Sequence, residues 1–116
     1  MAPFFNMKSD KRLAGKEVRA RLTQHFLDSY LAQYGVKPNG DAYRALTNAT
    51  YQIAFGCDAD GLRAQLGIGE KVNTRDYMDE HQLDLVIWAE DALANMLSNG
   101  LPIERALGEL WKVRPH

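Results

Sequence analysis

Three histidines and one cysteine are the side chains of this sequence best suited to metal binding or nucleophilic catalysis. They are His25, His81, His116 and Cys57. A metal site needs several nitrogen, oxygen or sulfur ligands at compatible spacing, and no two histidines stand four residues apart. Cys57 has no second cysteine, and the adjacent Asp58 disfavours a thiolate because like charges repel. We therefore expect no metal site, no cofactor and no nucleophilic site.

Two glycines near a lysine form a candidate phosphate-binding loop. The segment is Gly67-Ile-Gly69-Glu-Lys71. A loop of this kind presents backbone amides between a strand and a helix, with Ser or Thr after the lysine. Neither a preceding strand nor that hydroxyl residue is indicated here. The glycines are more typical of a helix end followed by a flexible loop.

A run of carboxylates could supply acid and base groups. It comprises Asp76, Asp79, Glu80 and Asp84. Negative side chains are also favoured at helix N-termini, where they oppose the helix dipole. We interpret the run as a solvated, helix-capping cluster, and we predict that the protein is not an enzyme.

Charge is unevenly distributed along the 116 residues, although the net charge is only −1. Residues 1–35 carry six basic and three acidic groups, whereas residues 76–116 carry three basic and eight acidic groups. Such polarity favours partners of opposite charge at each end. The candidate nucleic-acid contacts stand at helical spacing on one face, namely Lys8, Arg12, Lys16 and Arg19.

Exposed aromatic side chains are the second candidate for an interface. The sequence holds five tyrosines and two tryptophans, and an aromatic ring with a polar tip suits protein contacts. Self-association into a homodimer is an alternative use of the same rings, and rings that seal the ends of a bundle are another interpretation. The candidate protein interface comprises Tyr34, Tyr77 and Trp111 at element ends, together with Asp84 of the acidic third.

Apolar periodicity predicts the elements that position these residues. Capping signals set the expected ends of these helices, at Gly35, Asp41, Asp58 and Asp79. The expected elements are Lys11–Tyr34, Ala42–Phe55, Ala59–Leu66, a short turn at Thr74, Glu80–Leu97 and Pro102–Lys112. The consecutive apolar residues 85–88 indicate that the fourth long helix is central. We predict an all-α fold, a compact bundle of about five helices.

Domain organisation follows from length and composition. We expect residues 1–10 to be a flexible arm and residues 11–116 to form a single helical domain. No apolar run reaches the ~18 residues that span a bilayer, and the first residues lack the pattern of a secretory signal. A single cysteine fits a reducing compartment. We expect a cytoplasmic protein without membrane contact.

An ordered series of short segments between residues 41 and 97 carries a family resemblance. The segments are Tyr43-Arg-Ala-Leu46-Thr, Tyr51 to Gly56, Leu62 to Ile68, Arg75-Asp-Tyr-Met78, and Gln82-Leu83. The series resembles the C-terminal region of phage antirepressors of the BRO type and of the bacterial DNA-damage-inducible protein D. Tyr77 stands where that family tends to have His, Asp79 where it has Ser, and Gln82 where it has Glu.

The resemblance implies a free-standing regulatory module of a phage, prophage or mobile element. The DNA-binding domain that usually precedes the shared region has no counterpart in this sequence. Our leading hypothesis is a non-enzymatic regulator that binds another protein, such as a repressor or a host defence factor. The alternative is a small regulator that binds DNA directly through its basic first helix, which we favour less because the chain is charge-polarised.

Overall fold

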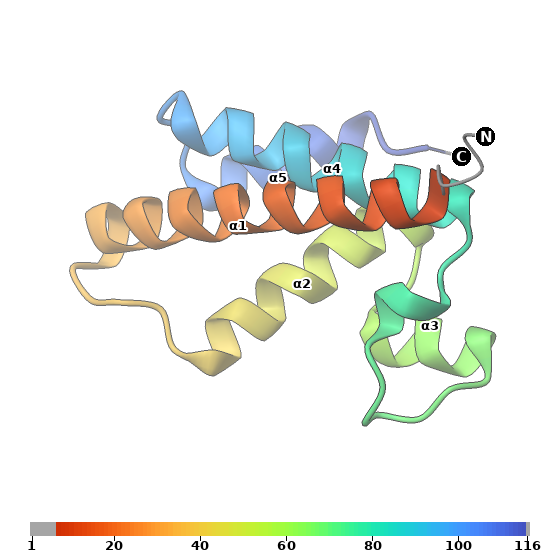
Figure 1. Ribbon diagram of the computed structural model, residues 1–116. Coiled ribbons are helices and arrows are strands. Elements are labelled where there is room, and N and C mark those ends of the chain that lie inside the picture. Colours follow the sequence, from red (N-terminus) through yellow and green to blue (C-terminus); the bar gives the residue numbers. More distant parts are fainter. Residues whose placement is uncertain (1–6, 116) are drawn as a thin grey trace.

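The computed structural model describes residues 7–115, with side chains described from Asp10 onward, and it is built from helices (Figure 1). No strand occurs within this described range, so the predicted all-α class with five α-helices is confirmed. The same range holds no helix that is long and apolar enough to cross a membrane. The elements are α1 (Met7–Tyr34), α2 (Gly40–Phe55), α3 (Ala59–Leu66), the 3₁₀ helix η1 (Thr74–Tyr77), α4 (Glu80–Ser98) and α5 (Ile103–Lys112).

Local capping signals set the starts of α3 and α4 where they were predicted. The side chain of Asp58 accepts a hydrogen bond from a backbone amide of the first turn of α3. Asp79 and Gln82 form a reciprocal capping box, in which each side chain accepts a hydrogen bond from the other residue's amide at 2.8 and 3.0 Å. These bonds satisfy amides that have no partner inside the helix.

Two other helices begin earlier than expected. Asn39, and not Asp41, caps α2, because its side-chain oxygen accepts a hydrogen bond from the amide of Ala42 at 2.9 Å. Helix α2 therefore starts at Gly40. Helix α1 starts at Met7, four residues before the expected Lys11, and residues 1–6 of the expected arm lie outside the described range.

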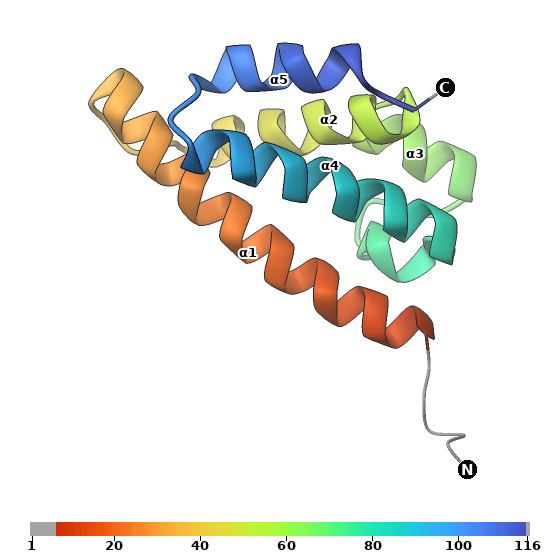
Figure 2. The same ribbon diagram turned by 90° about the horizontal axis from the view of Figure 1, so that it is seen from above.

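The long helices α1 and α4 lie side by side and run in the same direction (Figure 2). Side-chain contacts between residues 11–21 of α1 and 84–95 of α4 join positions 70 to 74 apart, and this nearly constant separation requires parallel helices. Antiparallel neighbours need only a short loop, whereas this pair is connected through α2, α3 and η1. The contacts are Lys11–Asp84, Arg19–Glu90, Arg21–Asp91 and Arg21–Asn95.

Helix α4 forms the centre of the main core, as its apolar run predicted. It packs against α1, α2 and α5, and α5 returns antiparallel to it (Figure 2). Leu22 and Phe26 of α1 bury against this core. A smaller cluster of Leu62, Met78 and Leu83 anchors α3 and η1 to the start of α4.

The apolar stripe of α1 extends beyond the core that it serves. Leu22 and Phe26 are 0% and 4% exposed, whereas Leu31 and Tyr34 are 36% and 50% exposed. The last turn of α1 is only partly covered, because α2 departs at an angle after the turn at residues 35–39 (Figure 1).

Candidate functional site

A buried carboxylate holds two arginines between the helices. Glu90 of α4 is 0% exposed. Arg75 contacts both of its carboxylate oxygens, at 2.8 and 2.9 Å, and Arg19 of α1 donates to one of them at 2.7 Å. A buried charge is tolerated only when it is paired and hydrogen-bonded. This Glu90 cluster therefore ties α1 and η1 to α4.

Further polar groups complete the cluster. Arg19 also donates to the hydroxyl of Thr47 in α2 at 2.5 Å. Burial by itself would lower the pKa of Arg75, but its hydrogen bonds and charge attraction to Glu90 outweigh burial, and Tyr51 adds to them, so the pKa is raised. Arg75 therefore stays charged, so deprotonation of this arginine does not reduce the number of charges in the cluster.

A row of ion pairs continues along the α1–α4 contact, and we call it the charge seam. Lys11 reaches both oxygens of Asp84 at 2.8 Å, and Arg21 pairs with Asp91. Arg12 of α1 reaches Asp76 of η1 at 3.1 Å. The basic N-terminal third and part of the acidic C-terminal third therefore neutralise each other within one molecule.

The predicted nucleic-acid contacts are distributed as follows. Arg12 and Arg19 are engaged in the pairs described above, with Asp76 and Glu90. Lys16 is exposed and has no ion-pair partner among the described side chains. Lys8 lies in α1, but its side chain is outside the described ones. Arg12, Lys16 and Arg19 line one hollow of about 350 Å³, so the structure brings these three together.

An apolar groove opens at the C-terminal end of α1, and we call it the aromatic groove. It has a volume of about 270 Å³ and is lined by side chains of α1, α2 and α5. The rings of Phe26, Tyr30 and Tyr34 follow one another along α1, with successive centroids 5.6 and 4.6 Å apart. The opposite wall is formed by Ile103 and Leu107 of α5.

The structure does not gather the four predicted protein-interface residues at one place. Tyr34 lines the aromatic groove. Tyr77 in η1 and Asp84 in the first turns of α4 lie at the other end of the molecule (Figure 1). Trp111 is 43% exposed near the end of α5, where the guanidinium of Arg114 stacks on its ring at 3.8 Å. Asp84 is already paired with Lys11.

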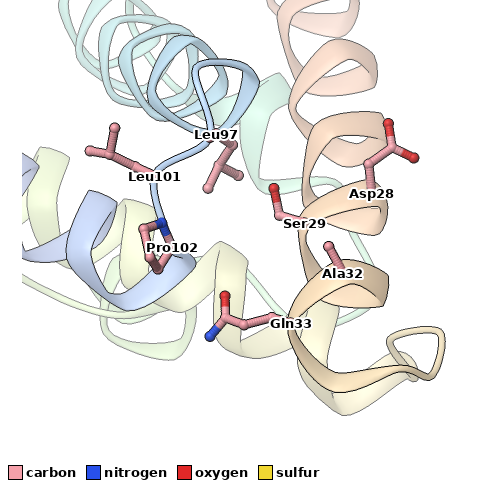
Figure 3. A pocket seen from close by; sticks show the side chains of 8 residues that line it. Asp28, Ser29, Ala32, Gln33, Leu97, Leu101 and Pro102 are labelled. Atoms are coloured by element: carbon pink, nitrogen blue, oxygen red, sulfur yellow. The ribbon is translucent and has the colours of Figure 1, made fainter.

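A third hollow, of about 390 Å³, lies between the end of α1 and the α4–α5 loop. Figure 3 shows Ser29 and Gln33 of α1 on one side, and Leu97 and Pro102 on the other. The Gln33 side chain accepts a hydrogen bond from the amide of Ile103 at 3.2 Å. Gln33 thereby caps α5, whose own first residues provide no side-chain cap. We therefore attribute this hollow to the packing of α1 against the start of α5.

The residues considered for metal binding and catalysis stay apart. Among the described residues, no group of three or more His, Cys, Asp or Glu side chains is placed to hold a metal ion, and His116 lies outside them. Burial raises the pKa of the Cys57 thiol, and the charge of Asp58 raises it further. The thiolate fraction at neutral pH is therefore small.

Comparison of the chain with protein families, with curated proteins and with solved structures gives no match. The likeness of residues 41–97 to antirepressor-type proteins therefore rests on the short sequence segments alone.

The Glu90 cluster is the part of the structure that sequence reasoning missed. Glu90 follows Leu83 and Val86 by seven and four positions and so shares their inward face. A single carboxylate on an otherwise apolar face indicates a buried, partnered charge. That signal was present in the sequence, but its partners Arg19 and Arg75 could be found only from the fold.

Proposed function

We propose that this chain is a non-enzymatic regulator that binds another protein through the aromatic groove. The main supporting observation is that apolar side chains remain partly exposed in this groove, with Tyr34 half exposed beside Tyr30 and Leu107. Clustered exposed aromatic and aliphatic side chains are typical of protein interfaces. The antirepressor-like segments support a cytoplasmic setting in a phage, prophage or mobile element.

The charges around the groove favour one kind of partner. Glu104 stands in the groove wall, is exposed, and has no ion-pair partner among the described side chains. An apolar helix or peptide with a basic flank would complement this wall. A repressor or a host defence factor presenting such a segment fits the proposal, and a second copy of the chain would give a homodimer.

The acidic face of α4 supports the proposal less than the groove does. Asp84 and Asp91 already meet cations of α1. A basic partner would have to displace those cations, which lowers the net gain from each new contact.

Affinity capture from a native host lysate tests the groove when it is run with matched variants. Tyr34 and Tyr77 are 50% and 51% exposed, so Tyr34→Asp and Tyr77→Asp introduce the same change at opposite ends of the molecule. We expect the wild type and Tyr77→Asp to retain one shared partner and Tyr34→Asp to lose it. Retention by both variants, or loss with Tyr77→Asp alone, contradicts the groove as the interface.

Direct DNA binding is a second candidate, because Arg12, Lys16 and Arg19 share one hollow. It predicts retardation of duplex DNA that weakens steeply with salt, since bound phosphates release counterions. The absence of any retardation at low salt ends this alternative.

A further inference from the structure

Two hollows that share Arg19 in their walls concentrate positive charge on the side of the molecule formed by α1, α2, α3 and η1. The first, of about 350 Å³, is lined by Arg12, Lys16, Arg19 and Arg75. The second, of about 400 Å³, is lined by Arg19, Arg44 and Arg63 together with Asp60, and Arg44 is paired with Asp41 at 2.8 Å. We call the two hollows together the cationic cleft.

The acidic groups of the first hollow do not balance its cations. Arg19 and Arg75 share the single carboxylate of Glu90, so this buried cluster carries one net positive charge. Arg12 is offset by Asp76, whose side chain is 59% exposed. Lys16 then adds a second positive charge at the hollow.

The second hollow contains one arginine, Arg63, that is only partly paired. The Nε of Arg63 is buried and has no hydrogen-bond partner in the described part of the chain. Its terminal nitrogen is 3.6 Å from Asp60, which is an ion pair but too long for a hydrogen bond. The side-chain oxygen of Asn48 is occupied by the amide of Ala59, which leaves the Asn48 amide nitrogen as a further donor. The Nε itself is closed to solvent, so a ligand in the hollow would meet the terminal nitrogens of Arg63, whose side chain is 26% exposed.

We infer that the cationic cleft binds the phosphate group of a small ligand, either inorganic phosphate or a phosphate monoester. Phosphate offers several charged acceptor oxygens, and guanidinium groups pair with it through two donors at once. Arg19 and Arg75 are largely buried between helices, so a small or terminal phosphate reaches them more readily than the backbone of a duplex, which is broad and convex. This site is separate from the aromatic groove and goes beyond the protein-binding proposal.

Such a ligand would join parts of the chain that are distant in sequence. Arg63 belongs to α3, Arg75 to η1, and Arg19 to α1. A ligand that binds only the folded form stabilises it by mass action. The cleft therefore provides a means by which a phosphate compound strengthens the attachment of the α3–η1 segment to α1.

Titration of the full chain with inorganic phosphate, at constant ionic strength maintained with chloride, tests the inference. We expect the arginine Nε–H resonances in NMR spectra to shift saturably, and Tm to rise by about 2–5 °C at saturation. A parallel titration with glycerol 3-phosphate distinguishes free phosphate from a monoester, and tighter binding of either supports the site. An equal effect of acetate at the same ionic strength overturns it.

Matched charge-removal variants locate the site. Lys16→Gln should weaken phosphate binding about threefold to fivefold, and Arg63→Gln about tenfold. Arg105→Gln removes the same charge from an exposed position of α5 outside the cleft and should leave binding unchanged. Lys16 is exposed, so its variant remains informative even if Arg63→Gln unfolds, which circular dichroism detects.

Equal weakening by Lys16→Gln and Arg105→Gln would overturn the inference, because it would indicate general charge attraction. Retardation of duplex DNA without any saturable effect of phosphate or glycerol 3-phosphate would also overturn it in favour of a nucleic-acid surface. Failure of the Tyr34 capture experiment has no bearing on either result, because Tyr34 lines neither hollow.

Discussion

The two ends of α1 make opposite use of their side chains. Toward its N-terminus, Lys11, Arg12, Arg19 and Arg21 meet acidic partners on α4 and η1. Toward its C-terminus, the apolar stripe runs past the core and leaves Tyr34 half exposed in the aromatic groove. One end is closed by contacts within the molecule, whereas the other presents surface that the chain does not cover.

The difference shows why residue type alone is a weak guide to an interface. Charged residues look available in a sequence, yet a complementary element elsewhere in the same chain engages many of them here. Apolar residues look internal, yet those beyond the last packed turn stay in contact with water. Mutations on each side of this comparison are expected to have different effects.

The largest loss of stability is expected from Glu90→Ala. The variant leaves Arg19 and Arg75 without their shared carboxylate, so the free energy of unfolding should fall by about 3–5 kcal/mol. Urea denaturation measures it. Glu17→Ala, at an exposed position of α1, should change stability by less than about 0.5 kcal/mol. A loss below about 1 kcal/mol for Glu90→Ala would show that the cluster does not hold the helices together.

An intermediate effect is expected where α1 and α4 approach each other. A Cβ added at the buried Gly15 would lie 3.4 Å from Cγ1 of Ile87, which is an ordinary contact at its close limit. Gly15→Ala should therefore be neutral or stabilising, because alanine favours helix. Gly15→Leu should lower stability by about 1–3 kcal/mol through overpacking. Thermal unfolding of the two variants checks the contrast, and equal Tm values would contradict a close helix contact.

A substitution in the aromatic groove should affect partner binding much more than it affects the free energy of unfolding. Tyr34→Ser removes a ring that stacks with Tyr30 at 4.6 Å, so it should cost about 0.5–1 kcal/mol. Capture of the partner should nevertheless be abolished. Circular dichroism and affinity capture on the same preparation measure both quantities. If the Tyr34→Ser variant still captured the partner, the groove would not be the binding surface.

The smallest effect is expected at the exposed part of the charge seam. Asp84 is 57% exposed and pairs with Lys11, so solvent screens the attraction. Asp84→Asn should lower stability by about 0.2–1 kcal/mol, and the difference from the wild type should shrink at high salt. Unfolding at low and high ionic strength measures this change. A loss that is insensitive to salt would indicate a role other than charge pairing.

Local features of the fold were predictable from the sequence, because their causes lie within a few residues. The Asp79–Gln82 capping box and the end of α1 at Gly35 depend on adjacent backbone groups. The predicted N-cap of α2 was wrong because Asn39 and Asp41 are both good capping residues. Apolar periodicity cannot decide which of two positions two residues apart begins the helix.

The candidate sites were harder to predict because they depend on which helices become neighbours. No local signal states that α1 and α4 are parallel, and that arrangement alone places Arg19 beside Glu90. The aromatic groove likewise depends on how α1, α2 and α5 come together, and Tyr34 stays half exposed in it. The opposite charges of the two ends of the sequence were informative, but many of them pair with each other between two helices of one chain.

The parallel arrangement of α1 and α4 also has a consequence for the order in which the molecule assembles. Their contacts join residues separated by 70 to 74 positions, and closing a loop of that length costs roughly 4 kcal/mol of chain entropy by the logarithmic scaling. At synthesis rates of ~5–20 residues per second, each of these α1 residues is made about 4–14 s before its partner in α4. During that interval Lys11 and Arg21 lack the acidic partners of α4, so the face of α1 that packs on α4 stays open to premature contacts in the nascent protein.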